Sequence, residues 1–386
     1  MPEKGMSGKA RSGLWPFILD NYILLIAGTV MALVWANLDN ASYERVAHLL
    51  HFPVNDIGMV FFFALATKEI IEATQPGGAL ASPREAAVPL LAAVGGMAGP
   101  AALYVAQATL AARPELMPGW AIPCATDIAF SYMAARLIFP RNHPAIPFLL
   151  LLAIADDALG LILLALFYPT GPLSFVALVG LMVPAVAIAW FMKRRGVNNF
   201  WAYTLTGGAL SWAALFYGGF HPALALVPIL PFLPRAARDL GLFGPEEHGL
   251  TDPLNRFEHW WKTPVQVILF FFGLANAGVM LAGVGSGTWI VLSSLLFGKP
   301  LGIVIATSLA LLVGLRAPGG LTLRDTTVVG LVAGIGFTVA LFFATAAFPS
   351  GAALDEVKMG ALFSFIAAPL AIGLGRIVGL SPRATN

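Results

Sequence analysis

Two adjacent carboxylates, Asp156 and Asp157, lie in the middle of a strongly apolar stretch, residues 146–168 (IPFLLLLAIADDALGLILLALFY). About ten mostly apolar residues flank the pair on each side, so in a membrane-spanning helix both carboxyls would lie roughly 15 Å from either end. Ionisable residues at that depth are costly to insert and indicate an ion or proton pathway. Because successive helical residues point about 100° apart, the two side chains must border a polar cavity or meet different partners. A structural ion pair that ties helices together is the alternative interpretation.

A third deep acid, Asp127, lies in residues 118–139 (PGWAIPCATDIAFSYMAARLIF), directly after Thr126. Pro123 precedes both residues, and proline removes a backbone donor and clashes with the preceding turn, so we expect an interrupted helix here. Free amides and carbonyls at membrane depth are tolerated only where the backbone lines a cavity or is buried in protein. A plain proline kink, with Thr126 bonded back to its own helix, remains open.

A matching stretch lies in the second half of the chain, residues 326–348 (TTVVGLVAGIGFTVALFFATAAF), where Gly334 and Gly336 precede Thr338. Because glycine weakens a helix, we expect a second broken span with a threonine near the bilayer centre. Two interrupted spans, one in each half, indicate an inverted-repeat transporter whose site lies at the helix breaks.

Lys299, in residues 289–313, lies about ten residues from the nearer end of its predicted span, too deep to reach the headgroups. Two broken helices that cross would bring helix ends of both polarities together, and Asp127 and Lys299 would balance those partial charges. A buried lysine is also a candidate proton carrier. A purely structural ion pair between Lys299 and an aspartate remains the alternative, and both interpretations hold if a cation competes with that pair.

The three deep carboxylates and the threonine hydroxyl offer hard oxygen ligands, which suit a small alkali cation. No His or Cys constellation suggests a transition metal. A carboxylate must be deprotonated to bind a cation and protonated to release it, so cation and proton would compete for one site. Such competition is sufficient for antiport.

Composition places these residues in a membrane. Of the 386 residues, 58% are hydrophobic and 11% are charged, and the mean hydropathy is +0.82, far outside the range of a soluble domain. We expect an all-α polytopic protein, a single transmembrane domain over residues 1–386. Its twelve predicted spans are 16–38, 56–73, 86–108, 118–139, 146–168, 173–192, 200–217, 221–233, 264–284, 288–313, 326–348 and 357–378. The single cysteine, Cys124, excludes an internal disulfide framework.

Lys and Arg residues predict the orientation, because they accumulate on the cytoplasmic side of membrane proteins. With residues 1–15 in the cytoplasm, 17 of the 22 Lys and Arg residues fall on that side, Lys68 and Lys299 lie within spans, and only Arg45, Arg113 and Lys358 fall outside. Both termini are therefore expected to be cytoplasmic. Residues 234–262 would form the main cytoplasmic loop, either as a plain solvated loop or as a regulatory surface whose histidines titrate near physiological pH.

Five runs resemble the signature segments of bacterial Na+/H+ antiporters of the NhaA family: ATDIAFSY (125–132), LLAIADDALG (151–160), GLANAGV (273–279), FGKPLGI (297–303) and AGIGFT (333–338). Their order and spacing match over nearly the whole chain. The resemblance implies a twelve-span inner-membrane exchanger with inverted repeats and two discontinuous crossing helices. It implies that Asp156 and Asp157 bind Na+ or Li+ beside Thr126. Asp127 and Lys299 would stabilise the crossing, with Lys299 pairing Asp156 when no cation is bound, and exchange would be electrogenic and pH-dependent.

The resemblance also implies residues of a pH response, namely His221 in GGFHPALALV, Glu258 in FEHW, and Glu69. A helix-end histidine and loop charges explain His221 and Glu258 equally well. Lys68 departs from the family pattern, because ATKEIIEA stands where the family has GLEVKREL. The first external loop, residues 39–55, is shorter than the dimerising hairpin of enterobacterial members, so a homodimer would need another contact.

Two other classes of protein also use buried carboxylates. An intramembrane aspartyl protease requires two aspartates that share one proton, but Lys299 would hold a carboxylate ionised and the GxGD-type context is absent. A sodium-coupled symporter of an organic solute is the stronger alternative, although no buried arginine or amide cluster is available to bind the solute. A passive cation channel is disfavoured because Lys299 opposes cation flow. We therefore expect a transporter rather than an enzyme, with no cofactor and no nucleic-acid partner.

Overall fold

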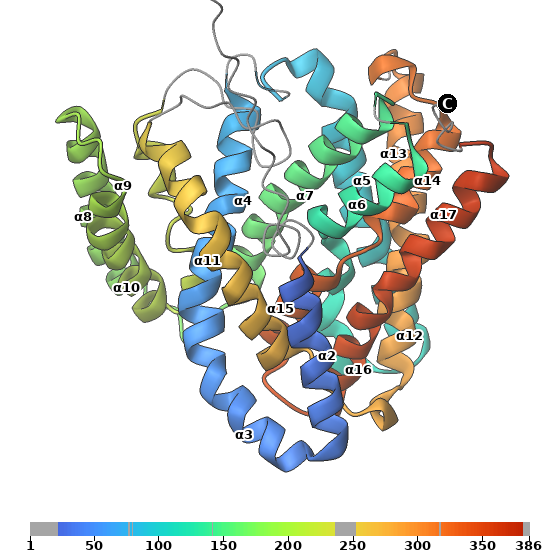
Figure 1. Cartoon of the computed structure of the whole chain (residues 1–386), viewed down its shortest axis with the longest axis horizontal. Coiled ribbons are helices and arrows are strands. Elements are labelled where there is room, and N and C mark those ends of the chain that lie inside the picture. Colours follow the sequence, from blue (N-terminus) through green and yellow to red (C-terminus); the bar gives the residue numbers. More distant parts are fainter. Residues whose placement is uncertain are drawn as a thin grey trace, which may run out of the picture.

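The computed structural model describes residues 22–75, 78, 80–140, 142–235, 252–315 and 318–380 (Figure 1). Within these ranges every regular element is a helix and no strand occurs, as the composition predicted. The predicted cytoplasmic segment 1–15 lies outside the described residues. So does most of the predicted loop 234–262, of which only residues 234–235 and 252–262 are described.

One group of helices packs around a long contact between its first and last members. We call it the α2–α4–α11 bundle, and it contains α2 (Ile23–Leu38), α3 (Asn40–His51), the π-helical turn η1 (Phe52–Gly58), α4 (Met59–Thr74) and α11 (Pro253–Asn276). The elements α3, η1 and α4 follow one another without a break and form one long curved helix that rises from α3 at the bottom of the view (Figure 1).

The segment 39–55 is helical, although the sequence predicted an external loop there. Asp39 caps α3 by accepting a hydrogen bond from the Ser42 backbone N (3.1 Å). At the other end of the segment, Asn55 and Asn276 exchange two buried amide hydrogen bonds of 2.9 Å each. These bonds tie η1 to the end of α11 and satisfy polar groups that a loop would expose to solvent.

The second group contains the two interrupted helices, broken between η2 and α6 and between α14 and α15, and we call it the core bundle. Its members are α5 (Pro83–Leu110), η2 (Pro114–Cys124), α6 (Ile128–Ile138), α7 (Ala145–Phe167), α12 (Ser286–Ser293), η7 (Ser294–Gly298), α13 (Lys299–Leu312), α14 (Leu323–Ala333), α15 (Phe337–Ala347), α16 (Ala352–Phe363), η9 (Ser364–Ile366) and α17 (Ala367–Ile377). Helix α5 packs along α13 and α7, and α12 packs along α16. The remaining described elements are α8 (Phe175–Arg194), α9 (Phe200–Tyr203), η3 (Thr204–Gly208), α10 (Ala209–Gly218) and the short turns η4 (Pro222–Leu224), η5 (Leu230–Phe232), η6 (Leu281–Gly283) and η8 (Pro318–Gly320).

Six described helical stretches are long and apolar enough to cross a membrane: Asn40–Thr74, Ala86–Leu110, Ala145–Phe167, Phe175–Arg194, Ser286–Leu312 and Ala352–Ile377. The pair α14 and α15, bent by 52° at its break, raises the number to seven. The total of twelve spans stays a prediction. Residues 221–233 are not one regular helix but the two 3-10 turns η4 and η5, because Pro222, Pro228 and Pro231 remove backbone donors.

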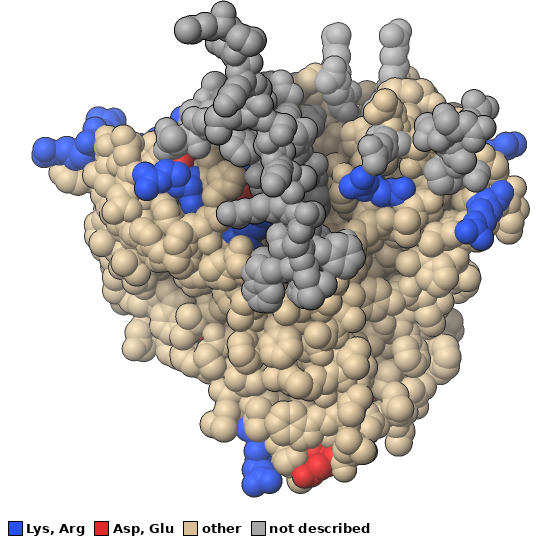
Figure 2. Space-filling view, viewed as in Figure 1, with Lys and Arg blue, Asp and Glu red and all other residues tan. Residues whose placement is uncertain are grey.

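Charge is segregated on the visible face of the molecule (Figure 2). Most visible Lys and Arg side chains lie along the upper edge, where α4 ends and α11 begins, and an uncharged band lies below it. We call the upper end the basic face. The segregation fits a protein whose middle contacts lipid.

Close packing of α5 on α13 positions Lys299. A Cβ atom built on Gly302 would lie 2.0 Å from the carbonyl oxygen of Gly95, and one on Gly298 would lie 2.7 Å from Pro100 Cα. Small residues let two membrane helices approach to backbone contact. The first turn of α13, which carries Lys299, is thereby held against the middle of α5.

Candidate functional site

Two breaks in the helices of the core bundle define the centre of the site. Between η2 and α6 the chain is extended, with Ala125 at φ −79°, ψ 151° and Asp127 at φ −83°, ψ 100°. Between α14 and α15 the break covers residues 334–336. A Cβ on Gly334 would lie 2.7 Å from the carbonyl oxygen of Leu295, so only glycine fits this close approach without a shift.

The two breaks lie against each other and share hydrogen bonds. The backbone N of Asp127 donates to the carbonyl oxygen of Ile335 (2.7 Å). One turn into α6, the hydroxyl of Ser131 donates to the carbonyl oxygen of Val332 (3.0 Å). Backbone groups that the interrupted helices leave unpaired are therefore satisfied by the opposite break.

Asp127 lies at the start of two helices at once. Its Oδ1 accepts from the backbone N of Phe130 (3.4 Å), and its Oδ2 accepts from the backbone N (3.1 Å) and the hydroxyl of Thr338. The bond from Phe130 ties Asp127 to α6, and the two bonds from Thr338 tie it to α15. A carboxylate at helix N-termini compensates the positive ends of their dipoles.

Lys299 provides the opposite compensation. Its Nζ donates to the carbonyl oxygen of Cys124 (2.5 Å), the last residue of η2, and lies 3.0 Å from Asp156 Oδ2. The side chain is fully buried. A cation at the carbonyl end of a helix is favourable, and the aspartate balances the remaining buried charge.

The adjacent aspartates occupy different environments. Asp156 Oδ2 accepts from the hydroxyl of Thr126 (2.7 Å), which also lies 3.1 Å from the carbonyl oxygen of Ala333. Asp156 Oδ1 is buried and has no hydrogen-bond partner among the described residues. Asp157 is half-buried and borders a cavity. Thr126 thus bonds across to Asp156 instead of back to its own helix. Of the two aspartates, Asp156 forms the ion pair with Lys299, and both border the cavity.

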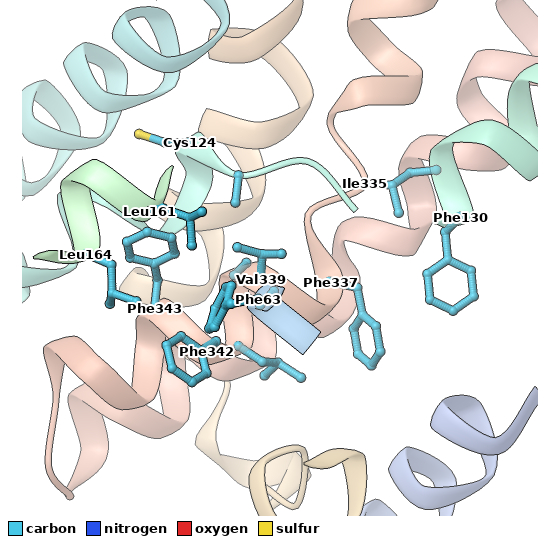
Figure 3. Packing of buried hydrophobic residues seen from close by; sticks show 14 of the residues in the cluster. Phe63, Cys124, Phe130, Leu161, Leu164, Ile335, Phe337, Val339, Phe342 and Phe343 are labelled. Carbon is cyan, nitrogen blue, oxygen red and sulfur yellow. The ribbon is translucent and has the colours of Figure 1, made fainter. Parts of the chain in front are cut away.

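The cavity lies between α4, α7 and α15 and has a free volume of about 10 Å³. Its lining consists of Phe62, Phe63, Ala66, Ala125, Asp156, Asp157, Gly160, Leu161, Leu164, Val339 and Phe343. The aromatic and aliphatic members gather on one side of the breaks, as Figure 3 shows for Phe63, Val339 and Phe343. A space of this size holds about one water molecule or a comparably small ion, and the two carboxylates supply polar partners for it. Among the described residues, the two carboxylates are its only charged lining groups.

The residues expected to respond to pH fall into two environments. Glu258 on α11 forms an ion pair with Lys68 on α4, and Glu69 follows Lys68 on the same helix. His221 is buried apart from them at the start of η4, where its Nδ1 accepts from the backbone N of Ala223 (3.4 Å).

Sequence reasoning missed several groups that complete the site. The carbonyl oxygens of Cys124, Ala333 and Ile335 are acceptors for Lys299, Thr126 and Asp127. Ser131 also contributes a hydroxyl across the breaks. No side-chain type marks a backbone acceptor, so these contacts leave no signal in a single sequence; Ser131 is signalled only by its position one turn after Asp127.

An all-helical membrane protein whose deep charges meet at two facing helix breaks belongs to the class of membrane transporters. Its relatives agree with that class. The sequence model of the family described as Na+/H+ antiporter 1 matches residues 20–375, and the chain belongs to this family. The resemblance seen in the five motifs is therefore confirmed.

Similar proteins cover nearly the whole chain. The Na(+)/H(+) antiporter NhaA of Geobacter metallireducens is 45% identical over 366 residues, covering 92% of this chain and 95% of that protein. The protein of the same name from Desulfitobacterium hafniense is 44% identical over 376 residues, covering 94% and 96%. The solved structure of the sodium proton antiporter MjNhaP1 from Methanocaldococcus jannaschii has a TM-score of 0.53 at 16% identity, covering 92% of this chain and 91% of that one, and shows a related fold.

Proposed function

We propose that this chain exchanges Na+ or Li+ for H+ across the bacterial inner membrane, with cation and protons competing for Asp156 and Asp157. One observation carries the proposal: the buried carboxylate of Asp156 and the half-buried one of Asp157 border a cavity the size of one small ion, beside two facing helix breaks. The names of the relatives, which cover more than 90% of the chain, support the same activity.

The cation would take its oxygen ligands from the two aspartates, with Thr126 nearby. Asp156 Oδ1, which has no hydrogen-bond partner in the described part of the chain, and the cavity-lining carboxylate of Asp157 are the available acceptors. Hard oxygens of this kind suit Na+ and Li+. When no cation is bound, Lys299 neutralises Asp156, and an arriving cation weakens that ion pair by competing for the same carboxylate.

Release of the cation would follow protonation of the carboxylates, and their deprotonation on the other side would complete the exchange. Two aspartates and one lysine meet at the site, while the cargo carries a single charge. Movement of more than one proton per cation would make the exchange electrogenic. Glu69, Glu258 and His221 are our candidates for a pH response, because they are the titratable groups that the family resemblance assigns to it.

A sodium-coupled symporter of an organic solute is not favoured. A free volume of about 10 Å³ leaves no room for a solute beside the ion. The lining adds no arginine or amide side chain that would orient one.

The orientation follows from charge, and both termini are proposed to be cytoplasmic. The basic face would then point into the cytoplasm (Figure 2). The helical segment 39–55 offers no hairpin for dimerisation, so a homodimer remains a prediction that cross-linking in membranes would test.

The test uses proteoliposomes with an imposed pH gradient and an internal pH dye, to which NaCl, LiCl, KCl or choline chloride is added over a range of pH. We expect Na+ or Li+ to collapse the gradient with the wild type and not with Asp157→Asn. Asp355→Asn is the matched control, because Asp355 is a half-buried carboxylate on α16 that does not line the cavity. A folded wild type that leaves the gradient intact with every cation would contradict the proposal, and imposed membrane potentials would test electrogenicity.

A further inference from the structure

Lys68 is a fully buried ammonium group outside the site described above. It lies on α4, and its Nζ forms ion pairs with Glu72 (2.6 Å), one turn further along α4, and with Glu258 on α11. The Glu258 and Glu72 side chains are 6% and 13% exposed, so the cluster is largely shielded from solvent. Stacking of Phe61 on Trp261, one turn from Glu258, closes the same interface between the two helices.

The cluster holds more negative than positive charge. The carboxylates of Glu69, Glu72 and Glu258 all act electrostatically on Lys68, which is the single cation among them. Removing Lys68 would therefore leave three carboxylates together, whereas removing one carboxylate would leave two carboxylates with one ammonium group.

The position of the cluster links it to the cavity. Ala66, two residues before Lys68 on α4, lines the cavity. Glu69 lies three residues after Ala66 and so on the same face of the helix. Its carboxylate acts electrostatically on Asp157 as well as on Lys68. From there α4 continues toward the basic face, where it ends at Thr74 (Figure 1). The charges of the cluster thus lie between the carboxylates of the site and the basic face.

We propose that Lys68 sets the affinity of the exchanger for its cation from the basic face, by neutralising the carboxylates that an incoming cation meets before it reaches Asp157. This inference rests on the proposed function. Lys68 does not touch the cation site and is a positioning and charge-balancing residue. A unit charge acts on another across about 10 Å strongly enough to change an equilibrium roughly twofold in water and tenfold or more at the effective dielectric of a protein surface.

Two variants of opposite sign test the proposal. Lys68→Gln makes the cluster between the basic face and Asp157 more negative, and we expect the apparent KM for Na+ to fall about two- to tenfold at low ionic strength. Glu258→Gln makes the same cluster less negative, and the apparent KM should rise by a similar factor. The double variant Lys68→Gln/Glu258→Gln removes one charge of each sign and should return the KM to near the wild-type value. Because salt screens buried charges much less than exposed ones, the opposite KM shifts of the two single variants should persist when choline chloride is raised from about 10 mM to about 300 mM.

Lys193→Gln is the matched control, because Lys193 is an exposed lysine at the end of α8, away from the cavity lining. It should leave the KM unchanged at both ionic strengths. A purely structural ion pair would change the amount of folded protein without KM shifts of opposite sign in the two single variants. If folded Lys68→Gln has the wild-type KM, or if Glu258→Gln shifts the KM in the same direction as Lys68→Gln, the proposal is wrong. Should Lys68→Gln fail to fold, Glu258→Gln and the double variant decide it. If the folded wild type shows no Na+ exchange, the proposed function is rejected, and this inference with it.

Discussion

The Asp127 carboxylate binds the start of α15 through Thr338, whose backbone N and hydroxyl both donate to Oδ2. The same carboxylate accepts from the backbone N of Phe130 in α6. One side chain therefore caps two helices, α6 and α15, each of which begins directly after one of the two helix breaks. Each helix start carries unpaired N–H groups and a partial positive charge, so a single negative charge stabilises both.

Asp127→Asn should lower the free energy of unfolding by about 1–2 kcal/mol, because it keeps an acceptor but removes the charge from both helix starts. Thermal unfolding in detergent measures the effect. Asp39→Asn, at the exposed cap of α3, is the control and should cost only a few tenths of a kcal/mol. Equal melting temperatures for Asp127→Asn and the wild type would show that the shared cap is unimportant.

Lys299 and Asp156 should be strongly coupled in stability. Lys299→Met leaves the buried Asp156 carboxylate without its cation and the Cys124 carbonyl without its donor, at a cost of about 3–5 kcal/mol. Adding Asp156→Asn removes the unpaired charge, so the double variant should be more stable than Lys299→Met alone. A double-mutant cycle of thermal unfolding in Na+-free buffer gives the coupling free energy, expected at about 1–3 kcal/mol. Additive effects would mean that the two side chains do not interact.

Competition between protons and Na+ predicts the sign of a pH effect. Protonated carboxylates cannot bind Na+, so the apparent KM for Na+ should fall as the pH rises, while the rate at saturating Na+ changes less. Initial rates of dye response, measured over a grid of Na+ concentration and pH, provide the test. A KM that does not depend on pH would place protons and Na+ at separate sites.

Much of the site could be predicted from the sequence, because its chemistry lies in side chains that are out of place in a membrane. Asp127, Asp156 and Lys299 are recognisable by depth alone, and Pro123 and Gly334 mark the two breaks by their backbone preferences. The structure brings these elements together at one point. Single-sequence reasoning cannot supply their partners, since the acceptors are backbone oxygens far away in the chain.

The errors in the predicted fold also have physical reasons. Residues 39–55 were predicted as a loop because polar residues interrupt the apolar pattern, yet those polar groups are caps and buried amide pairs. Residues 221–233 are apolar enough for a span, but their prolines break the helix into turns. Apolar periodicity indicates burial; it does not indicate whether the backbone hydrogen bonds of a helix can form.

Phe342 should affect transport more than an equally buried phenylalanine on the same helix. Its ring packs on Phe63 of α4 (4.9 Å between centroids), on His221 (4.7 Å) and on Phe272 of α11 (6.3 Å), all outside the core bundle. Figure 3 shows Phe342 beside Phe63, which lines the cavity. Phe342→Ala would open this apolar contact, so we expect Na+ to leak without counter-movement of protons.

Phe337→Ala is the control for that leak. Phe337 is equally buried on α15, but its aromatic neighbours Phe130 and Phe365 belong to the core bundle. Both substitutions should cost about 3–5 kcal/mol of stability. Radioactive Na+ efflux at clamped pH should rise several-fold only with Phe342→Ala. The same efflux from both variants would mean that the contact has no role in coupling.

Gly302 should tolerate no side chain, because its α-carbon faces the backbone of α5. A methyl group would lie 2.0 Å from the carbonyl oxygen of Gly95, so Gly302→Ala must push α13 away from α5. Lys299 lies one turn earlier on α13, and its bond to Cys124 should lengthen with that shift. We expect a melting temperature several degrees lower and weaker Na+ exchange. Gly180→Ala on α8 is the matched control, since nothing lies within 4 Å of its added methyl group, and alanine there should leave stability unchanged or slightly higher. A Gly302→Ala variant as stable and active as Gly180→Ala would show that α5 and α13 do not need this close approach to hold Lys299 in place.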